Sequence, residues 1–506
     1  MTPSKPNDFG SPSPFNVSLY KIARQPKPGV FALSLLPSAS HSQASRAGVT
    51  FLAIVGSAGI GVASFAAPKL LLLGTAFAIV VALYLLSRLY ALLLFVAARP
   101  LVDALGGTFS EFGLSASSWW AVGVTAIAVI VLLQESRARS LGLSPRVLPV
   151  FALILGYIFA VAVERASGGV LYVTSAFALT AWALLCLAIG ALSESRESQR
   201  AVVLGIDAAA ITLSVSVLVL VLRNQYGALY YSADHWSTWN PVTMALPHTY
   251  ALFAVMLMPI VLAQIHARYH VRLAAVLSVT LSLVVILSYV RSSYLALIIV
   301  WVVFVAQAVG TSPARVRLTA AVVSGGAAIA FYVSRAEILH RVSDLQLVLL
   351  PGSSADAAGS GRWGFWQHLL ERATDTNTHL LFGQGAGASR RILLEFMGVG
   401  LWSHNDFLEV LVAGGLVLLA IFCVFVGWML ASILPLARDS LQTLPSRRFA
   451  VLALAGTCSW VLVAFTNGAA FYQSSVALGV LVGLSRAMRL TPRATWLDSV
   501  RQHQLP

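Results

Sequence analysis

Apolar runs of about 17 to 22 residues recur along most of this chain, and they limit what it can fold into. A helix of that length covers the roughly 30 Å of hydrocarbon in a bilayer. Backbone N–H and C=O groups in lipid must be hydrogen-bonded within the protein, so helices are the expected secondary structure. The runs therefore predict an all-α, polytopic membrane protein.

The composition agrees with that class. Hydrophobic residues make up 58% of the chain and charged residues 10%, whereas soluble proteins carry about 25% charged residues. The net charge of +14 would suggest a nucleic-acid partner for a soluble protein. Here most cationic residues lie in short gaps between apolar runs, where they set the orientation and meet anionic membrane lipids. We therefore expect membrane lipids, and no nucleic acid, among the partners.

The apolar runs can be placed along the chain with few ambiguities. The clearer ones are residues 117–134, 147–163, 170–192, 201–222, 248–265, 273–289, 293–310, 318–333, 406–433, 449–466 and 474–487. Runs 48–66 and 70–98 precede them, and the second contains Arg88, so it fits either one tilted helix or two short ones. The helix count within residues 47–100 stays open on this basis.

Arginine-rich gaps alternate with other gaps, and the short ones among these hold one arginine (Arg165, Arg223 or Arg291) or none. The first kind contains Arg137, Arg139 and Arg146; Arg196 and Arg200; Arg268 and Arg272; Arg315 and Arg317; Arg438, Arg447 and Arg448; and Arg486, Arg489 and Arg493. The positive-inside rule places these gaps in the cytoplasm. It places gaps 100–116, 223–247, 290–292, 334–405 and 467–473 on the outer face. Because the N-terminal tail is also expected inside, the number of spans should be even, about twelve or about fourteen, and we expect about twelve.

The same criteria divide the chain into five segments. Residues 1–46, rich in proline, serine and basic residues, are expected to form a disordered cytoplasmic tail. The tail is followed by an N-terminal transmembrane bundle at 47–333, a large outer loop at 334–405, C-terminal transmembrane helices at 406–487 and a cytoplasmic tail at 488–506.

The outer loop is more than a linker. Between Arg362 and Arg372, apolar side chains recur with helical spacing, which predicts an amphipathic helix able to lie in the membrane interface. The glycine- and serine-rich residues 352–361 predict a flexible hinge before it. The glycines at 383–387 do not follow a strand, so they indicate a tight turn rather than a dinucleotide-binding fingerprint.

Two arginines on the predicted outer face are candidates for binding an anion. Arg291 lies in a gap of about three residues between two apolar runs, at the edge of the bilayer. It either extends toward lipid headgroups or marks a site, as ionisable groups at membrane depth do. A guanidinium group donates bidentately to a diphosphate and keeps its charge. Arg362 opens the amphipathic helix, where it is either a solvated charge or a second donor aided by the helix N-terminus.

His404 is the candidate for proton transfer. It lies where the loop re-enters the membrane, between Ser403 and Asn405. An isolated histidine is more often structural, but Asp406 and Glu409 are close in sequence. A carboxylate can hold an imidazole in its basic tautomer, which favours the catalytic interpretation.

Three segments carry a resemblance to a known family. They are Ser-Tyr-Val-Arg291-Ser-Ser-Tyr-Leu-Ala-Leu, Ser-Gly-Arg362-Trp-Gly-Phe-Trp and Trp-Ser-His404-Asn-Asp-Phe-Leu-Glu-Val-Leu-Val-Ala-Gly-Gly, with a weaker one at Trp-Asn240-Pro241-Val-Thr-Met-Ala-Leu-Pro247-His-Thr-Tyr-Ala. In this order they resemble the O-antigen ligase and polymerase superfamily. Its members are bacterial inner-membrane glycosyltransferases that act on undecaprenyl-diphosphate-linked glycans. The resemblance covers about residues 200–470.

The resemblance implies a role for each candidate residue. Arg291 and Arg362 would engage the lipid diphosphate, and His404 would be catalytic. Supporting candidates are Asn405, Asp406 and Arg223. The resemblance also implies a periplasmic active site in the loop at 334–405, and no metal, cofactor or nucleotide sugar. Single displacement by an acceptor hydroxyl would invert the anomeric configuration.

The sequence leaves several functions open. A ligase moves the finished glycan to lipid A-core, whereas an O-antigen or exopolysaccharide polymerase adds lipid-linked repeat units, and both use the same donor chemistry. Fold analogy favours the ligase, although the long N-terminal tail and the Ser292–Ser293 pair depart from the family pattern. A membrane transporter would be expected to show inverted repeats and charges at the midplane. The candidate residues gather on one face instead, which favours an interfacial enzyme.

Overall fold

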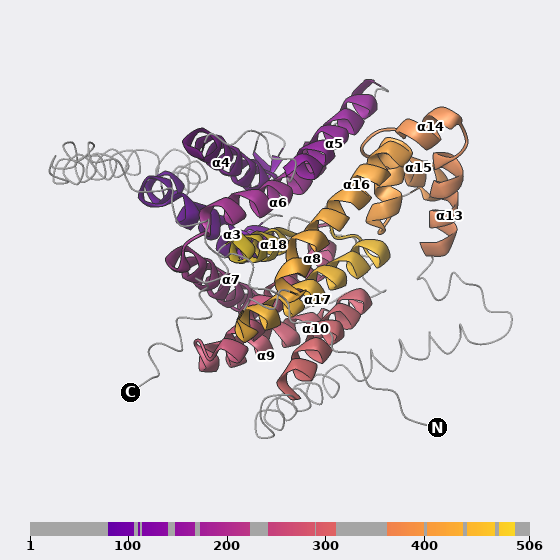
Figure 1. The fold of residues 1–506 in the computed structure, drawn as a ribbon. Helices are drawn as coiled ribbons and strands as arrows, with labels where there is room; N and C mark the ends of the chain where they lie inside the picture. Colours follow the sequence, from indigo (N-terminus) through magenta and orange to yellow (C-terminus); the bar gives the residue numbers. More distant parts are fainter. Residues whose placement is uncertain are drawn as a thin grey trace, which may run out of the picture. The chain divides into compact units, whose positions relative to one another are not determined.

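The computed structural model describes residues 79–105, 110–111, 114–139, 147–166, 173–222, 241–288, 290–309, 362–398, 402–438, 443–470 and 475–490. Contacts divide the chain into two compact units, Met1–Ala82 and Leu83–Pro506, and the second holds every element considered below. Within the described residues this unit consists of helices and one short antiparallel pair of strands, β1 (Ser110–Glu111) and β2 (Leu114–Ser115) (Figure 1).

The helices follow the apolar runs of the sequence. They are α3 (Arg88–Leu105), α4 (Ala116–Arg139), α5 (Leu148–Ala166), α6 (Val173–Leu192), α7 (Arg196–Leu222), α8 (Pro241–Ala267), α9 (Val271–Leu287), α10 (Arg291–Val309), α13 (Arg362–Ala373), α14 (Asn377–Phe382), α15 (Ala388–Met397), α16 (Asp406–Arg438), α17 (Leu444–Thr466) and α18 (Val476–Leu490). Ser87 interrupts the run predicted at 70–98, and α3 begins immediately after it.

Six helices in the described ranges are long and apolar enough to cross a membrane, namely α4, α5, α7, α8, α16 and α17. Three shorter apolar helices, within α6, α9 and α10, accompany them. The all-α membrane class is therefore confirmed. The runs predicted at 48–66 and 318–333, the tail at 1–46, the hinge at 352–361 and the last residues from 491 onward lie outside the described residues, so the predicted total of spans stays a prediction.

Aromatic side chains form the core where α6, α16 and α17 meet. Trp182 of α6 lies with its ring 5.3 Å from Phe425 of α16 and 5.3 Å from Trp460 of α17, between ring centroids. All three side chains are fully buried. Both indole N–H groups find acceptors, since Trp182 donates to the Ala470 carbonyl at 2.8 Å and Trp460 to the Ser475 hydroxyl at 2.9 Å. This core therefore fixes the segment that follows α17.

The amphipathic helix predicted at 362–372 is confirmed as α13. Its buried face, Phe365, Leu369 and Ala373, packs into one apolar cluster with side chains of α15 and α16. Its other face exposes Trp363, with 57% of the residue accessible. Figure 1 shows α13, α14 and α15 grouped beside α16, with which all three make contact. An ion pair of 2.5 Å between Arg391 of α15 and Glu164 of α5 ties the same group to α5.

The apolar run predicted as continuous at 406–433 forms α16, but its backbone is broken at Gly414 and Gly415. A break frees carbonyl groups that a continuous helix would use, and buried carbonyls need other donors. The turn at 383–387 supplies them. The N–H of Gln384 donates to the Val412 carbonyl at 2.8 Å, and the N–H of Gly385 donates to that of Ala413 at 3.0 Å.

Close backbone contact explains the glycine at the break. Gly415 has φ 65, and a Cβ atom there would lie 2.3 Å from the Leu381 backbone, so only glycine fits. The glycine-rich segment at 383–387 is thus a tight turn, as its sequence predicted, and it docks on the broken helix.

Candidate active site

The turn that follows α17, residues 466–470, is where the candidate residues meet. The Thr466 carbonyl accepts a hydrogen bond of 2.7 Å from Arg362 Nη1, at the start of α13. Asp406, the first residue of α16, accepts through Oδ2 from the N–H groups of Ala469 at 2.5 Å and Ala470 at 2.6 Å. Gly468 has φ 77, a left-handed conformation that favours glycine. The turn therefore joins the beginnings of α13 and α16 to the end of α17.

His404 is held in a constrained segment before α16. Its backbone is left-handed, with φ 53, which is uncommon for a residue with a side chain. On one side, the Trp366 indole donates to the Ser403 carbonyl at 2.6 Å. On the other, Asn405 Oδ1 accepts from the backbone N–H groups two and three residues later, at 3.0 and 3.1 Å. Asn405 is therefore the N-cap of α16, and it positions His404 through the backbone.

The environment of His404 keeps its ring neutral. The side chain is half-buried, and its Nδ1 is buried with no hydrogen-bond partner among the described residues. Burial lowers the pKa of His404 to about 4, and the positive charge of Arg362 acts in the same direction, while a hydrogen bond to the Asn467 backbone acts against them. At neutral pH the ring can therefore accept a proton.

A second histidine lies beside His404. His248, in α8, is buried, and its ring centroid lies 6.5 Å from that of His404 with the ring planes inclined at 44°. Its Nδ1 is 2.6 Å from the side-chain nitrogen of Asn467. Sequence reasoning quoted His248 within a weak motif and placed Asn467 in an outer gap, but it gave neither a role. The sequence signal that could have identified them is that each is a polar residue at the outer end of an apolar run.

The two carboxylates near His404 have other roles than the one that their sequence positions suggested. Asp406 binds the turn described above. Glu409 accepts from the Ser389 hydroxyl, at 2.7 Å, and from the Ser403 N–H, at 3.3 Å. The hydrogen bonds that these carboxylates make within the described part of the chain thus shape the backbone around His404. The backbone of Asn467 raises the pKa of the His404 ring, against the effect of burial.

The structure places the backbone of Arg291 at the same end of the helices. Arg291 is the first residue of α10, which runs antiparallel to α17. The Ser459 hydroxyl donates to the Ala296 carbonyl at 3.0 Å, and the Gln307 amide donates to the Arg448 carbonyl at 3.2 Å. The two contacts are equally spaced on both helices, so the start of α10 is level with the end of α17. The side chain of Arg291 and the whole of Arg223 lie outside the described residues.

Comparison with known proteins adds one finding. Residues 276–423 match a family model described as O-antigen ligase, and no curated protein matches the chain. The matched segment includes Arg291, Arg362 and His404, whereas His248 and Asn467 lie outside it. Residues 276–423 are thus similar to the O-antigen ligase family, in agreement with the resemblance of the three ordered motifs to the O-antigen ligase and polymerase superfamily.

Proposed function

We propose that this protein transfers a glycan from an undecaprenyl-diphosphate carrier to an acceptor hydroxyl, with lipid A-core as the acceptor. The observation that carries the proposal is the meeting of Arg362 and His404 at the 466–470 turn, two residues of the matched segment that are far apart in sequence. The O-antigen ligase match supports ligase- or polymerase-type transfer, and the choice of carrier and acceptor is ours.

The proposal includes a location. The protein would lie in the bacterial inner membrane with about twelve spans, and the loop at 334–405 would face the periplasm. The support is that Arg362, His404 and Asn467 all come from gaps that the arginine distribution assigns to the outer face. The donor would then bind with its polyprenyl tail against the membrane helices and its diphosphate near the turn.

In the proposed reaction the acceptor hydroxyl attacks the anomeric carbon while the bond to the diphosphate oxygen breaks. Negative charge grows on the leaving diphosphate, and the guanidinium groups of Arg291 and Arg362 stabilise it. His404, neutral because its pKa is low, takes the hydroxyl proton. A single displacement of this kind inverts the anomeric configuration. The two arginines supply the positive charge, so the proposal assigns no role to a metal ion.

The test uses purified protein in detergent with an undecaprenyl-diphosphate-linked glycan and, in parallel, lipid A-core or additional donor. A single shift of the core lipid is the expected result. A ladder of products formed from donor alone would replace the ligase with a polymerase. Absence of transfer to either acceptor, by protein that binds the donor, would overturn the proposed function.

A further inference from the structure

Asn467 contacts both histidines of the site, one through its side chain and one through its backbone. Its side-chain nitrogen lies 2.6 Å from His248 Nδ1, and its backbone acts on the pKa of the His404 ring, whose centroid lies 6.5 Å from that of His248. Asn467 is 3% exposed, and its own N–H is bonded to the Val463 carbonyl at 2.8 Å. It ends α17, within the turn that Arg362 and Asp406 also bind. Contacts of both its side chain and its backbone therefore fix the position of Asn467.

The contact with His248 has a defined direction. An amide nitrogen can only donate, so His248 Nδ1 is the acceptor and the proton of that ring is on Nε2. His248 thus fixes the rotation of the Asn467 side chain. Because the N–H of Asn467 is also bonded to the Val463 carbonyl at 2.8 Å, the same contact restrains the Asn467 carbonyl.

The contact with His404 also has a direction. It raises the pKa of His404, which is the effect of a carbonyl that accepts from the ring. Nδ1 of His404 has no partner among the described residues, so the donating atom is Nε2. The proton is then on Nε2 and the lone pair is on Nδ1, which is buried in this structure and has to be uncovered for an acceptor hydroxyl to reach it. The hydrogen bond at one ring nitrogen sets the state of the other.

We propose that His248 and Asn467 set the tautomer and orientation of His404, in place of the carboxylate that orients many catalytic histidines. His248 and Asn467 are positioning residues, because they act through His404 rather than on the glycan. The inference rests on the proposed function for its catalytic consequence. It goes beyond the family match, since both residues lie outside residues 276–423.

The first experiment compares variants of His248 with a matched control on the same helix. His248→Phe keeps a ring but removes the acceptor, and His248→Asn returns an acceptor close to the position of Nδ1. His266→Phe is the control, since His266 lies near the other end of α8 with its ring 4.5 Å from Phe304. We expect His248→Phe to lower kcat about 10- to 100-fold, with KM for the lipid-linked donor unchanged. His248→Asn should recover most of the rate, and His266→Phe should match the wild type.

A double variant tests whether the two residues act together. Asn467→Ala keeps the backbone carbonyl but loses the contact with His248. If the pair acts as one unit, His248→Phe/Asn467→Ala loses no more rate than the worse single variant. Multiplied losses in the double variant, wild-type kcat in His248→Phe, or failure of His248→Asn to restore the rate would each overturn the proposal.

A second readout is independent of turnover. In protein labelled with ¹⁵N-histidine, the signals of His404, identified by their loss in His404→Ala, should show a protonated Nε2 and an unprotonated Nδ1. His248→Phe should shift them toward a mixture of tautomers, and His266→Phe should not. Unchanged His404 signals in His248→Phe would refute the inference. If the wild type showed the expected signals but transferred no glycan, the proposed function would fail and the positioning role would stand.

Discussion

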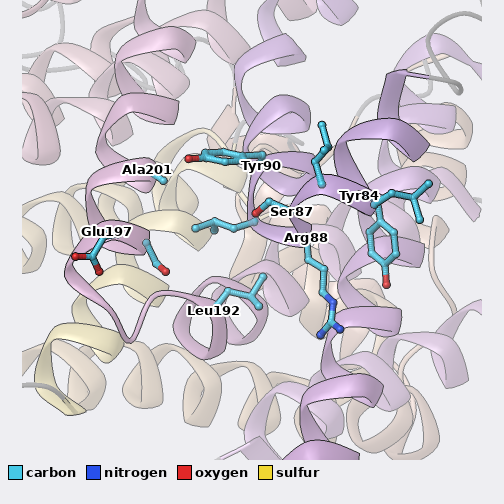
Figure 2. Close-up of a pocket in the computed structure, with 11 residues that line it drawn as sticks. Tyr84, Ser87, Arg88, Tyr90, Leu192, Glu197 and Ala201 are labelled. Carbon is cyan, nitrogen blue, oxygen red and sulfur yellow. The ribbon is translucent and has the colours of Figure 1, made fainter. Parts of the chain in front are cut away.

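Two regions of this protein bring polar groups together, and only one has the features of an active site. The first is the 466–470 turn with its partners. The second is a cavity of about 450 Å³ between the start of α3 and the junction of α6 and α7. The cavity is lined by Tyr84, Leu85, Leu86, Ser87, Arg88, Leu89, Tyr90, Leu192, Glu197, Ser198 and Ala201 (Figure 2).

The polar groups of the cavity are exposed or only partly buried, and two of them bind nearby side chains. The Arg88 side chain is 41% exposed and lies 3.3 Å from Glu135, and the Tyr84 hydroxyl donates to Gln134 at 2.8 Å. Figure 2 shows Arg88 and Tyr84 on one side of the cavity and Glu197 on the other. The attraction between Arg88 and Glu135 is weakened by water, because the Arg88 side chain is partly exposed. The cavity is large, but its groups are not arranged around any one point.

The turn gathers groups from α8, α13 and the segment before α16, and most of them are buried. His248, Asn405, Asp406 and Asn467 are each less than a tenth exposed. Burial of polar groups is costly unless each has a partner. The comparison teaches that convergence of buried polar groups, rather than the volume of a cavity, identifies the candidate site in this protein.

The strongest test of this comparison removes the imidazole ring of His404, which lies beside the 466–470 turn. His404→Ala should lower transfer by roughly 10²- to 10⁴-fold, the contribution of a general base, while the unfolding temperature in detergent changes little. The rate is measured with purified protein and lipid-linked donor. Wild-type transfer by this variant would show that the convergence at 466–470 is structural only.

The next largest effect is expected from the arginine at the start of α13. Arg362→Ala should lower transfer by about 10²- to 10³-fold, because a donor to the leaving group is lost. Arg362→Lys should retain part of the rate, since it keeps the charge without the planar fork. Arg372→Ala, an exposed position on the same helix, is the matched control and should keep full activity. Equal losses in Arg362→Ala and Arg372→Ala would point to helix stability instead.

The pH dependence sharpens the assignment of the base. The pKa of His404 is lowered to about 4, below the ordinary value of 6.5, so the reactive neutral ring is fully present above about pH 5. The rate should be constant from pH 8 to 5 and fall about tenfold per pH unit below 4. A rate that declines already below pH 7 would mean that His404 is not shielded as the structure indicates.

The smallest effect on transfer and stability is expected from a substitution in the cavity. Arg88→Ala removes the partly exposed pair with Glu135, and such pairs contribute about 0.2–1 kcal/mol to stability. Thermal unfolding should shift only slightly, and transfer should equal that of the wild type. A large loss of transfer would reverse the comparison and make the cavity part of the working site.

Much of the helical framework could be predicted from the sequence, because hydrocarbon imposes a simple rule on length and polarity. The run at 147–163 became α5, Leu148–Ala166, and the amphipathic stretch at 362–372 became α13, Arg362–Ala373. The break in α16 was missed. Two glycines inside an apolar run look continuous in sequence, and only the docked turn at 383–387 shows why Gly415 is needed.

The site could be predicted only in part. His404 and Arg362 were proposed because their segments resemble a family, and the structure places both beside one turn. His248 and Asn467 were missed because their significance depends on helices that meet only in three dimensions. Asp406 was placed near His404 correctly, but sequence distance cannot tell whether a carboxylate points at a ring or at a neighbouring backbone.

The break in α16 also limits how the helices beside His404 can move. If α13–α15 swung away as a flap, the carbonyls of Val412 and Ala413 would lose their donors at membrane depth, a penalty of several kcal/mol each. Helices α13–α15 are therefore expected to stay attached to α16 and to move with it. If the protein transfers glycan as proposed, we expect the donor and the acceptor to enter along other boundaries of the helix bundle.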